Sequence, residues 1–189
     1  MARLVAERAP HATLRLLTTA LPDETAFTEE GADVVLLSRP LRSALRRERL
    51  YDDRYVVIAA QSAAPDDASA IDLLRSLPHV MWEAARQRVQ PYAVLAEHGV
   101  DYVVGQVVQE NFLIPPLVAQ VGGVAVHRHR IATSMSQRFP LRIEEFPFPI
   151  PGLGMDMVLN PRLTDDGFVV WLRGVLQDAA AEVLAASST

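Results

Sequence analysis

The segment Gln109-Glu110-Asn111-Phe112 places amide, acidic and aromatic side chains where a predicted strand ends and a predicted helix begins. Ligands of open α/β sheets gather outside the carboxyl ends of the strands, where free backbone N–H groups at a helix N-terminus can bind an anion. We therefore expect Glu110, Asn111 and Phe112 to contact a small ligand. The alternative is a plain helix cap in which Asn111 is the N-cap residue.

Side chains at other strand ends and at two chain crossings extend this candidate site. Arg39 follows a predicted strand, and an arginine can bind a carboxylate through two parallel hydrogen bonds, although an exposed arginine at a strand end is the alternative. Aromatic rings supply apolar area and polar side chains orient the ligand, as in most small-molecule pockets. The predicted ligand contacts are Thr18, Thr19, Arg39, Gln61, Trp82, Glu110, Asn111, Phe112 and Phe146.

Two histidines, His127 and His129, stand two residues apart at the end of a predicted strand. This spacing would place both imidazoles on one face and within reach of a metal ion. No third ligand stands nearby in the sequence, so we favour a polar strand terminus and predict neither a metal site nor a cofactor. Adjacent carboxylates such as Asp52-Asp53 and Glu144-Glu145 could serve acid–base chemistry, but in loops they are typically solvated caps.

The composition removes whole classes of chemistry. The 189-residue chain has no cysteine, and all 18 of its basic residues are arginine, which excludes disulfides, thiolate metal sites, cysteine nucleophiles and lysine Schiff bases. It also lacks the sequence signatures of serine hydrolases, zinc proteases and nucleotide-binding loops. A net charge of −5 argues against binding of a nucleic-acid backbone by this chain. These absences narrow the range of possible reactions but do not by themselves exclude an enzyme.

The chain has the composition of a globular protein, because 50% of its residues are hydrophobic and 22% are charged. Its N-terminus lacks the apolar core of a signal peptide. No apolar run approaches the roughly 20 residues needed to cross a bilayer. We expect a cytoplasmic protein without a membrane partner.

Predicted helices and strands alternate along most of the chain. Apolar runs of the kind found in buried strands occur at residues 13–17, 34–37, 55–60, 79–82, 102–109, 124–127, 141–145 and 155–159. Short helices are expected between many of them, and an amphipathic helix spans residues 168–183. This alternation predicts an α/β fold with mainly parallel strands covered by helices on both faces.

Two segments are predicted to cross between lobes. One is the polar loop at residues 61–67, and the other is the stretch at residues 146–152, where spaced prolines exclude a helix. They divide the chain into lobe I, residues 1–61 plus 147–189, and an inserted lobe II, residues 62–146. This is the plan of a hinged two-lobe binding protein whose ligand contacts face each other across a cleft.

Five motifs follow one another in a characteristic order: APHATLRL at residues 9–16, GADVVL at 31–36, LYDDRYVVIA at 50–59, LVAQVGGVAV at 117–126, and RLTDDG at 162–167 followed by WLR at 171–173. Over essentially the whole chain they resemble the effector-binding domain of LysR-type transcriptional regulators, in the branch of nodulation and aromatic-catabolism regulators. The resemblance implies a two-lobe, type 2 periplasmic-binding-protein-like fold with a hinge, without the family's usual first strand.

The resemblance also implies a ligand-sensing domain without catalytic activity, which binds a small organic effector, aromatic or carboxylate-bearing, in the interlobe cleft. It implies a homodimer that contacts DNA only through a helix-turn-helix domain absent from this chain. The sequence departs from the family at His127, where proline is usual, and at Val158, where this branch often has tryptophan. The alternative is a stand-alone or transport-type binding protein of the same fold, and an enzyme ranks third.

Overall fold

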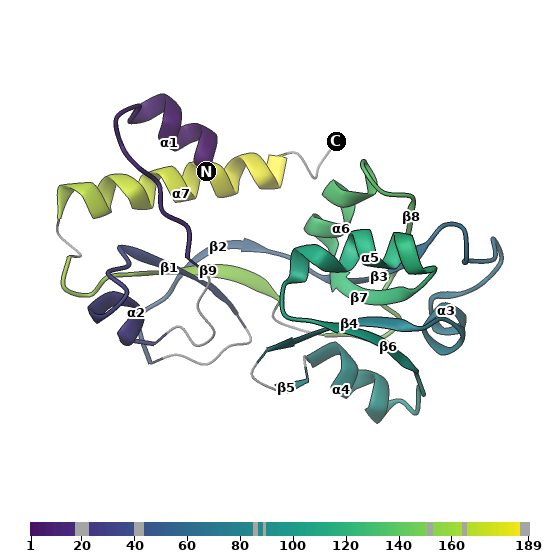
Figure 1. Ribbon diagram of the computed structural model, residues 1–189. Coiled ribbons are helices and arrows are strands. Elements are labelled where there is room, and N and C mark those ends of the chain that lie inside the picture. Colours follow the sequence, from purple (N-terminus) through teal and green to yellow (C-terminus); the bar gives the residue numbers. More distant parts are fainter. Residues whose placement is uncertain are drawn as a thin grey trace. The chain divides into compact units, whose positions relative to one another are not determined.

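The computed structural model describes residues 1–17, 23–39, 44–84, 87–88, 90–150, 153–163 and 166–185 (Figure 1). The predicted ligand contacts Thr18 and Thr19 lie outside these residues. The chain divides into two compact units: the first contains residues 1–52 and 152–189, and the second contains residues 53–151.

The first unit is built on a three-stranded antiparallel sheet in the order β1-β9-β2. Strand β9 (Gly154–Leu159) lies in the middle and pairs with β1 (Val34–Ser38) and β2 (Glu48–Asp52). Val35 and Leu37 of β1 are buried while Leu36 between them is 46% exposed, the alternation expected of a strand with one covered face. Val35 and Leu37 pack with Phe27 of the short helix α2 (Thr25–Thr28).

Two helices pack against each other in this unit (Figure 1). Helix α1 (Ala2–Arg8) buries Leu4 and Val5 against Val175 of α7 (Gly167–Ala185). A seven-residue helix is too short to be stable by itself, so this contact, rather than helix propensity, maintains α1. None of the helices in the described ranges is both long and apolar enough to span a membrane.

The strand predicted at residues 13–17 is absent from the structure. Leu16 and Leu17 are 69% and 55% exposed. A strand requires a hydrogen-bonded neighbour, and among the described residues β1 pairs only with β9. The local apolar pattern is therefore present without the partner that would make it a strand.

The second unit contains a larger, mixed sheet in the order β5-β4-β7-β3-β8, with β6 also paired to β4. Its strands are β3 (Tyr55–Ala60), β4 (His79–Ala84), β5 (Gln87–Arg88), β6 (Val104–Val108), β7 (Val124–Arg128) and β8 (Leu141–Glu145). Only the pairings of β4 with β6 and with β7 are parallel among those described. The prediction of mainly parallel strands was therefore wrong, because an apolar run shows that a strand is buried but not which way it runs.

Helices cover both faces of this sheet (Figure 1). Helices α3 (Ala70–Ser76) and α4 (Gln90–Glu97) pack on one face, whereas α5 (Ile114–Val121) and α6 (His129–Ser136) pack on the other. Val57 of β3 faces the first pair and Val56 faces the second. This double coverage explains why every residue from 56 to 60 is apolar and fully buried.

Along the sequence, the boundaries between the two units fall between residues 52 and 53 and between residues 151 and 152. The sequence analysis expected these boundaries at 61/62 and 146/147. Strand β3 belongs to the second unit because both of its partners, β7 and β8, lie there. Phe146 and Phe148, which follow β8, also pack against the second unit's core. Strand pairing therefore explains the first boundary, and the packing of Phe146 and Phe148 explains the second.

Candidate functional site

One edge of the second unit's sheet collects several of the predicted site residues. Strands β4, β6 and β7 are mutually parallel through β4, so their carboxyl ends lie at the same edge, which we call the carboxyl edge. Strand β3 begins there and β8 ends there, because Val56 of β3 pairs antiparallel with His127 and with Glu145. The residues placed at this edge are Trp82, Glu110, Asn111, Phe112 and Phe146.

The chain between β6 and α5 forms a turn at residues 109–113, the last three of which are the 3-10 helix η1 (Asn111–Leu113). The indole N–H of Trp82 donates a 2.7 Å hydrogen bond to the carbonyl of Gln109. The Nε2 atom of His127 lies 3.0 Å from the carbonyl oxygen of Asn111. The turn is thus bound by side chains of two strands, and Asn111 does not cap a helix with its own side chain.

The turn presents both polar and apolar groups. Asn111 is half-buried, Glu110 is exposed, and Phe112 is 61% exposed. The backbone N–H groups of Asn111 and Phe112 have no hydrogen-bond partner within the described part of the chain. These groups can donate to a ligand oxygen beside an exposed aromatic ring.

His127 is the functional candidate that the sequence analysis did not place in the ligand site. It is 3% exposed, and burial lowers the pKa of its imidazole, against smaller raising effects of the carbonyls of Asn111 and Arg128. Both ring nitrogens face carbonyl oxygens, which only accept: Nε2 lies 3.0 Å from that of Asn111 and Nδ1 lies 3.4 Å from that of Arg128. The single proton of the neutral ring is assigned to Nε2 because its contact is the shorter one. The sequence did contain one signal for this role: residue 127 is a histidine, whereas the domains that the chain resembles usually have proline there.

The second histidine of the pair, His129, lies in the first turn of α6, with Nε2 3.4 Å from the hydroxyl oxygen of Thr133. Within the described ranges, no group of three or more histidine, cysteine, aspartate or glutamate residues is arranged to hold a metal ion.

Two predicted contacts do not join the 109–113 turn. Gln61 follows the far end of β3, where its N–H donates to the carbonyl of Pro140, so it lies at the edge opposite the carboxyl edge. Phe146 packs on the α3 and α4 face, whereas Trp82 packs on the α5 and α6 face. Gln61, which is predicted as a ligand contact at a chain crossing, is separated from the carboxyl edge by residues 55–60, and its contact with a ligand stays a prediction.

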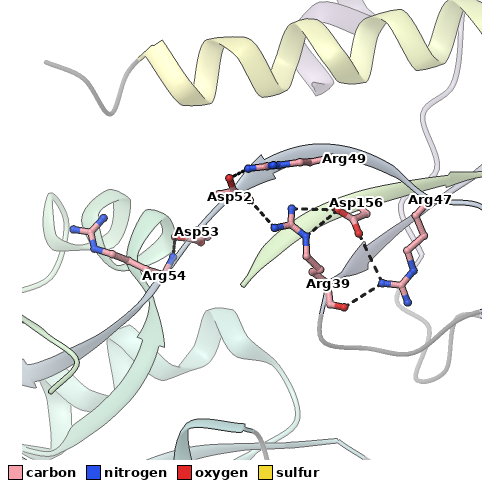
Figure 2. A network of polar contacts seen from close by, with 7 residues as sticks. All are labelled: Arg39, Arg47, Arg49, Asp52, Asp53, Arg54 and Asp156. Carbon is pink, nitrogen blue, oxygen red and sulfur yellow. Dashed lines mark hydrogen bonds and ion pairs between the residues drawn. The ribbon is translucent and has the colours of Figure 1, made fainter. Parts of the chain in front are cut away.

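In the first unit, Arg39 is bound by carboxylates of the chain itself (Figure 2). Its Nη1 lies 2.6 Å from Oδ1 of Asp52, and its Nε and Nη2 lie 3.4 and 3.3 Å from Oδ1 of Asp156. Arg47 donates to the carbonyl of Arg39 at 3.1 Å and lies 3.7 Å from the other oxygen of Asp156. Arg49 also pairs with Asp52. Asp156 is 6% exposed, so this network holds a buried charge at the middle strand of the sheet.

The arginine fits closely because residue 154 is a glycine. A Cβ atom at Gly154 would lie 2.6 Å from Nη2 of Arg39 and 2.7 Å from the backbone oxygen of Tyr51. Such distances are shorter than any ordinary contact, so only glycine leaves room for the guanidinium group here.

Asp53, the first residue of the second unit, connects the start of this unit to α6. Its Oδ1 accepts hydrogen bonds from the backbone N–H groups of Arg54, at 2.9 Å, and Arg130, at 3.3 Å. The guanidinium of Arg54 pairs with the carboxylate of Glu145 at 2.8 Å and lowers the pKa of that carboxyl group. These contacts attach the beginning of β3 to the end of β8 and to the first turn of α6.

The chain is similar to one family of regulatory domains over nearly its whole length. The family model described as the LysR substrate binding domain matches residues 1–184. Nodulation protein D 1 of Bradyrhizobium japonicum is 28% identical, with 98% of this chain and 59% of the relative covered. Nodulation protein D 1 of Mesorhizobium japonicum is 29% identical, with 95% and 58% covered. The chain therefore spans somewhat more than half the length of these relatives.

Solved structures show the same fold. The regulatory domain of MexT, a transcriptional activator of Pseudomonas aeruginosa, superposes with a TM-score of 0.76 at 17% identity, covering 93% of this chain and 87% of that one. The regulatory domain of Synechocystis PCC6803 CcmR, solved in complex with 2-PG, gives a TM-score of 0.72 at 19% identity, with 95% and 90% covered. These neighbours have the type 2 periplasmic-binding-like fold, which confirms the predicted fold class.

Proposed function

Because this chain belongs to the family of LysR substrate-binding domains, we propose that it is the ligand-sensing regulatory domain of a LysR-type transcription factor. The family predicted from the sequence motifs is thus confirmed, and the role follows from membership together with the chemistry of the carboxyl edge. The observation that carries the proposal is the 109–113 turn, which is bound by Trp82 and His127. Its N–H groups at Asn111 and Phe112 have no acceptor among the residues that the structure describes.

The proposed ligand is a small organic molecule with an aromatic ring or a carboxylate group. The N–H groups of Asn111 and Phe112 and the half-buried amide of Asn111 suit an acceptor oxygen. The ring of Phe112, 61% exposed, supplies apolar contact area. Glu110 is exposed, so its carboxylate can remain in solvent when an anion binds beside it.

Arg39 is proposed to bind the ligand by exchanging one of its carboxylate partners, Asp52, for a carboxylate of the ligand. Its contact with Asp156 is buried, but Asp52 is 49% exposed and also pairs with Arg49. A ligand carboxylate could replace Asp52 at the guanidinium while Asp156 keeps its place. The contributions of Thr18, Thr19 and Phe146, and the binding of the effector in a cleft between the lobes, stay predictions.

For the whole protein we propose the properties that membership in the family supports. These are contact with DNA through a helix-turn-helix domain outside this chain, a homodimer, a cytoplasmic location and the absence of catalysis. The further domain is supported by the length of the relatives, of which this chain covers 59% and 58%. The homodimer, the location and the absence of catalysis are supported by membership in the family alone.

A binding screen followed by two variants tests the proposed ligand site. The panel consists of benzoate, salicylate and 2-PG, each titrated into the chain while backbone N–H chemical shifts of residues 109–113 are followed by NMR. Asn111→Ala and Phe112→Ala are each expected to weaken binding by roughly 1–3 kcal/mol, the scale of a lost hydrogen bond or aromatic contact. Phe168→Ala on α7, where the ring is 48% exposed, is the matched control and should leave affinity unchanged.

Binding of none of these compounds at millimolar concentration would contradict the proposed ligand class. Binding that neither the Asn111 nor the Phe112 variant weakens would show that the ligand site lies elsewhere.

A further inference from the structure

Two side chains from different strands bind the backbone of the same short turn. Trp82 comes from β4 and donates to the carbonyl of Gln109, whereas His127 comes from β7 and lies within hydrogen-bond distance of the carbonyl of Asn111. The two carbonyls are two residues apart, and Glu110 between them is exposed. Each strand therefore fixes one end of the segment that carries Glu110.

His127 contacts the carbonyl oxygen of Asn111, which also accepts the first hydrogen bond of the following helix. The carbonyl of Asn111 accepts the N–H of Ile114, the first residue of α5, in addition to the imidazole. The ring is almost fully buried, and a polar group buried without a hydrogen bond is costly. The imidazole and the turn thus depend on each other: the ring needs an acceptor, and the turn has no side-chain cap of its own.

Trp82 makes the corresponding contact on the other side of the turn. It pairs with Val108, the last residue of β6, so its indole reaches the residue directly after that strand. The indole N–H is a donor only, and this donor is used by the Gln109 carbonyl. The polar atom of Trp82 is therefore committed to the chain itself.

We infer that Trp82 and His127 are positioning residues, which hold the 109–113 turn in the conformation that presents Asn111 and Phe112 to the ligand. The part that concerns the ligand rests on the proposed function, whereas the holding of the turn rests on the two hydrogen bonds alone. His127 acts as the neutral tautomer with its proton on Nε2, donating to Asn111.

Three variants separate the hydrogen bonds from the bulk of the side chains. His127→Leu fills the same space without a donor, and His127→Gln restores an N–H donor near the position of Nε2. Trp82→Phe keeps an aromatic ring and removes the indole N–H. The measurement is amide hydrogen exchange at Leu113 and Ile114, whose N–H groups close the turn.

We expect exchange at Leu113 and Ile114 to accelerate about tenfold or more in His127→Leu and Trp82→Phe, and to return to within about threefold of the parent chain in His127→Gln. Exchange at Val57, in the core on the other sheet face, should stay unchanged. A purely structural role of His127 would instead accelerate exchange across the sheet, and the glutamine would not rescue it. The imidazole ¹⁵N spectrum at neutral pH should show the Nε2-protonated tautomer.

Titration of the same variants with benzoate, salicylate and 2-PG distinguishes failure of the positioning role from failure of the proposed ligand class. If the exchange pattern holds and none of the compounds binds, the positioning role stands and the proposed ligand class fails. If His127→Leu unfolds the chain, the milder Trp82→Phe decides by itself. Unchanged exchange at Leu113 and Ile114 in Trp82→Phe and in every folded His127 variant would overturn the inference, whatever binds.

Discussion

Burial rather than distance is expected to decide which carboxylate around Arg39 stabilises the first unit. Asp52 makes the shorter contact with the guanidinium, 2.6 Å, but its side chain is 49% exposed. Asp156 makes the longer contact, 3.3 Å, and its side chain is 8% exposed. An exposed ion pair contributes about 0–1 kcal/mol, whereas breaking a buried pair costs about 3–5 kcal/mol.

Asp156→Asn should therefore destabilise the first unit by about 2 kcal/mol. The value lies below the range for a fully buried pair because Arg39 is 28% exposed and keeps Asp52 as a partner. Asp52→Asn should cost less than about 1 kcal/mol. Both substitutions change a carboxylate to an amide of the same shape, which removes the negative charge and replaces one acceptor oxygen by an NH2 donor. The same chemical change is thus compared at a buried and at an exposed position.

Urea unfolding followed by tryptophan fluorescence can report on this unit alone. The chain has two tryptophans, Trp171 in the first unit and Trp82 in the second. In a Trp82→Phe background the signal comes from Trp171, and both aspartate variants are compared in that background. A cost for Asp52→Asn equal to or greater than that for Asp156→Asn would refute the reasoning that burial outweighs distance.

Three further substitutions or conditions give measurable effects. Gly154→Ala should cost roughly 1–3 kcal/mol in the same urea assay, because its Cβ would lie 2.7 Å from a backbone oxygen that cannot easily move; a stability equal to the parent chain would contradict this packing. Gly122→Ala should cost about 1 kcal/mol, since residue 122 ends α5 with a φ of 72°, and Gly122→Asn should cost less. Lowering the pH from 7.5 to 5.5 should destabilise the second unit by at most about 4 kcal/mol, about 1.4 kcal/mol for each of three histidines. Burial lowers the pKa of His79, His127 and His129, so the unfolded chain takes up protons below its histidine pKa of 6.5 that the folded chain does not. Urea midpoints that do not fall as the pH is lowered would exclude this.

Local sequence patterns predicted much of the architecture. The apolar runs at residues 34–37, 55–60 and 124–127 became β1, β3 and β7, and the junction at Glu110 to Phe112 became the turn at the carboxyl edge. These features depend on neighbours in the chain: burial of a short segment, a stop at glycine, or a change from extended to helical backbone. The order of the motifs likewise identified the family, because motif order is itself a property of the linear sequence.

Strand direction, partner choice and the placement of single side chains were decided by contacts between distant residues. Residues 13–17 carry a strand pattern but pair with no strand in the described part of the chain. Gln61 lies at the edge opposite the 109–113 turn because β3 runs antiparallel to β7. Asp156 reaches Arg39 from a strand 117 residues away, and His127 meets Asn111 only because β7 and β6 flank β4. Hydrogen bonds and ion pairs of this kind have no local signature, since either residue would look the same in the sequence without its partner.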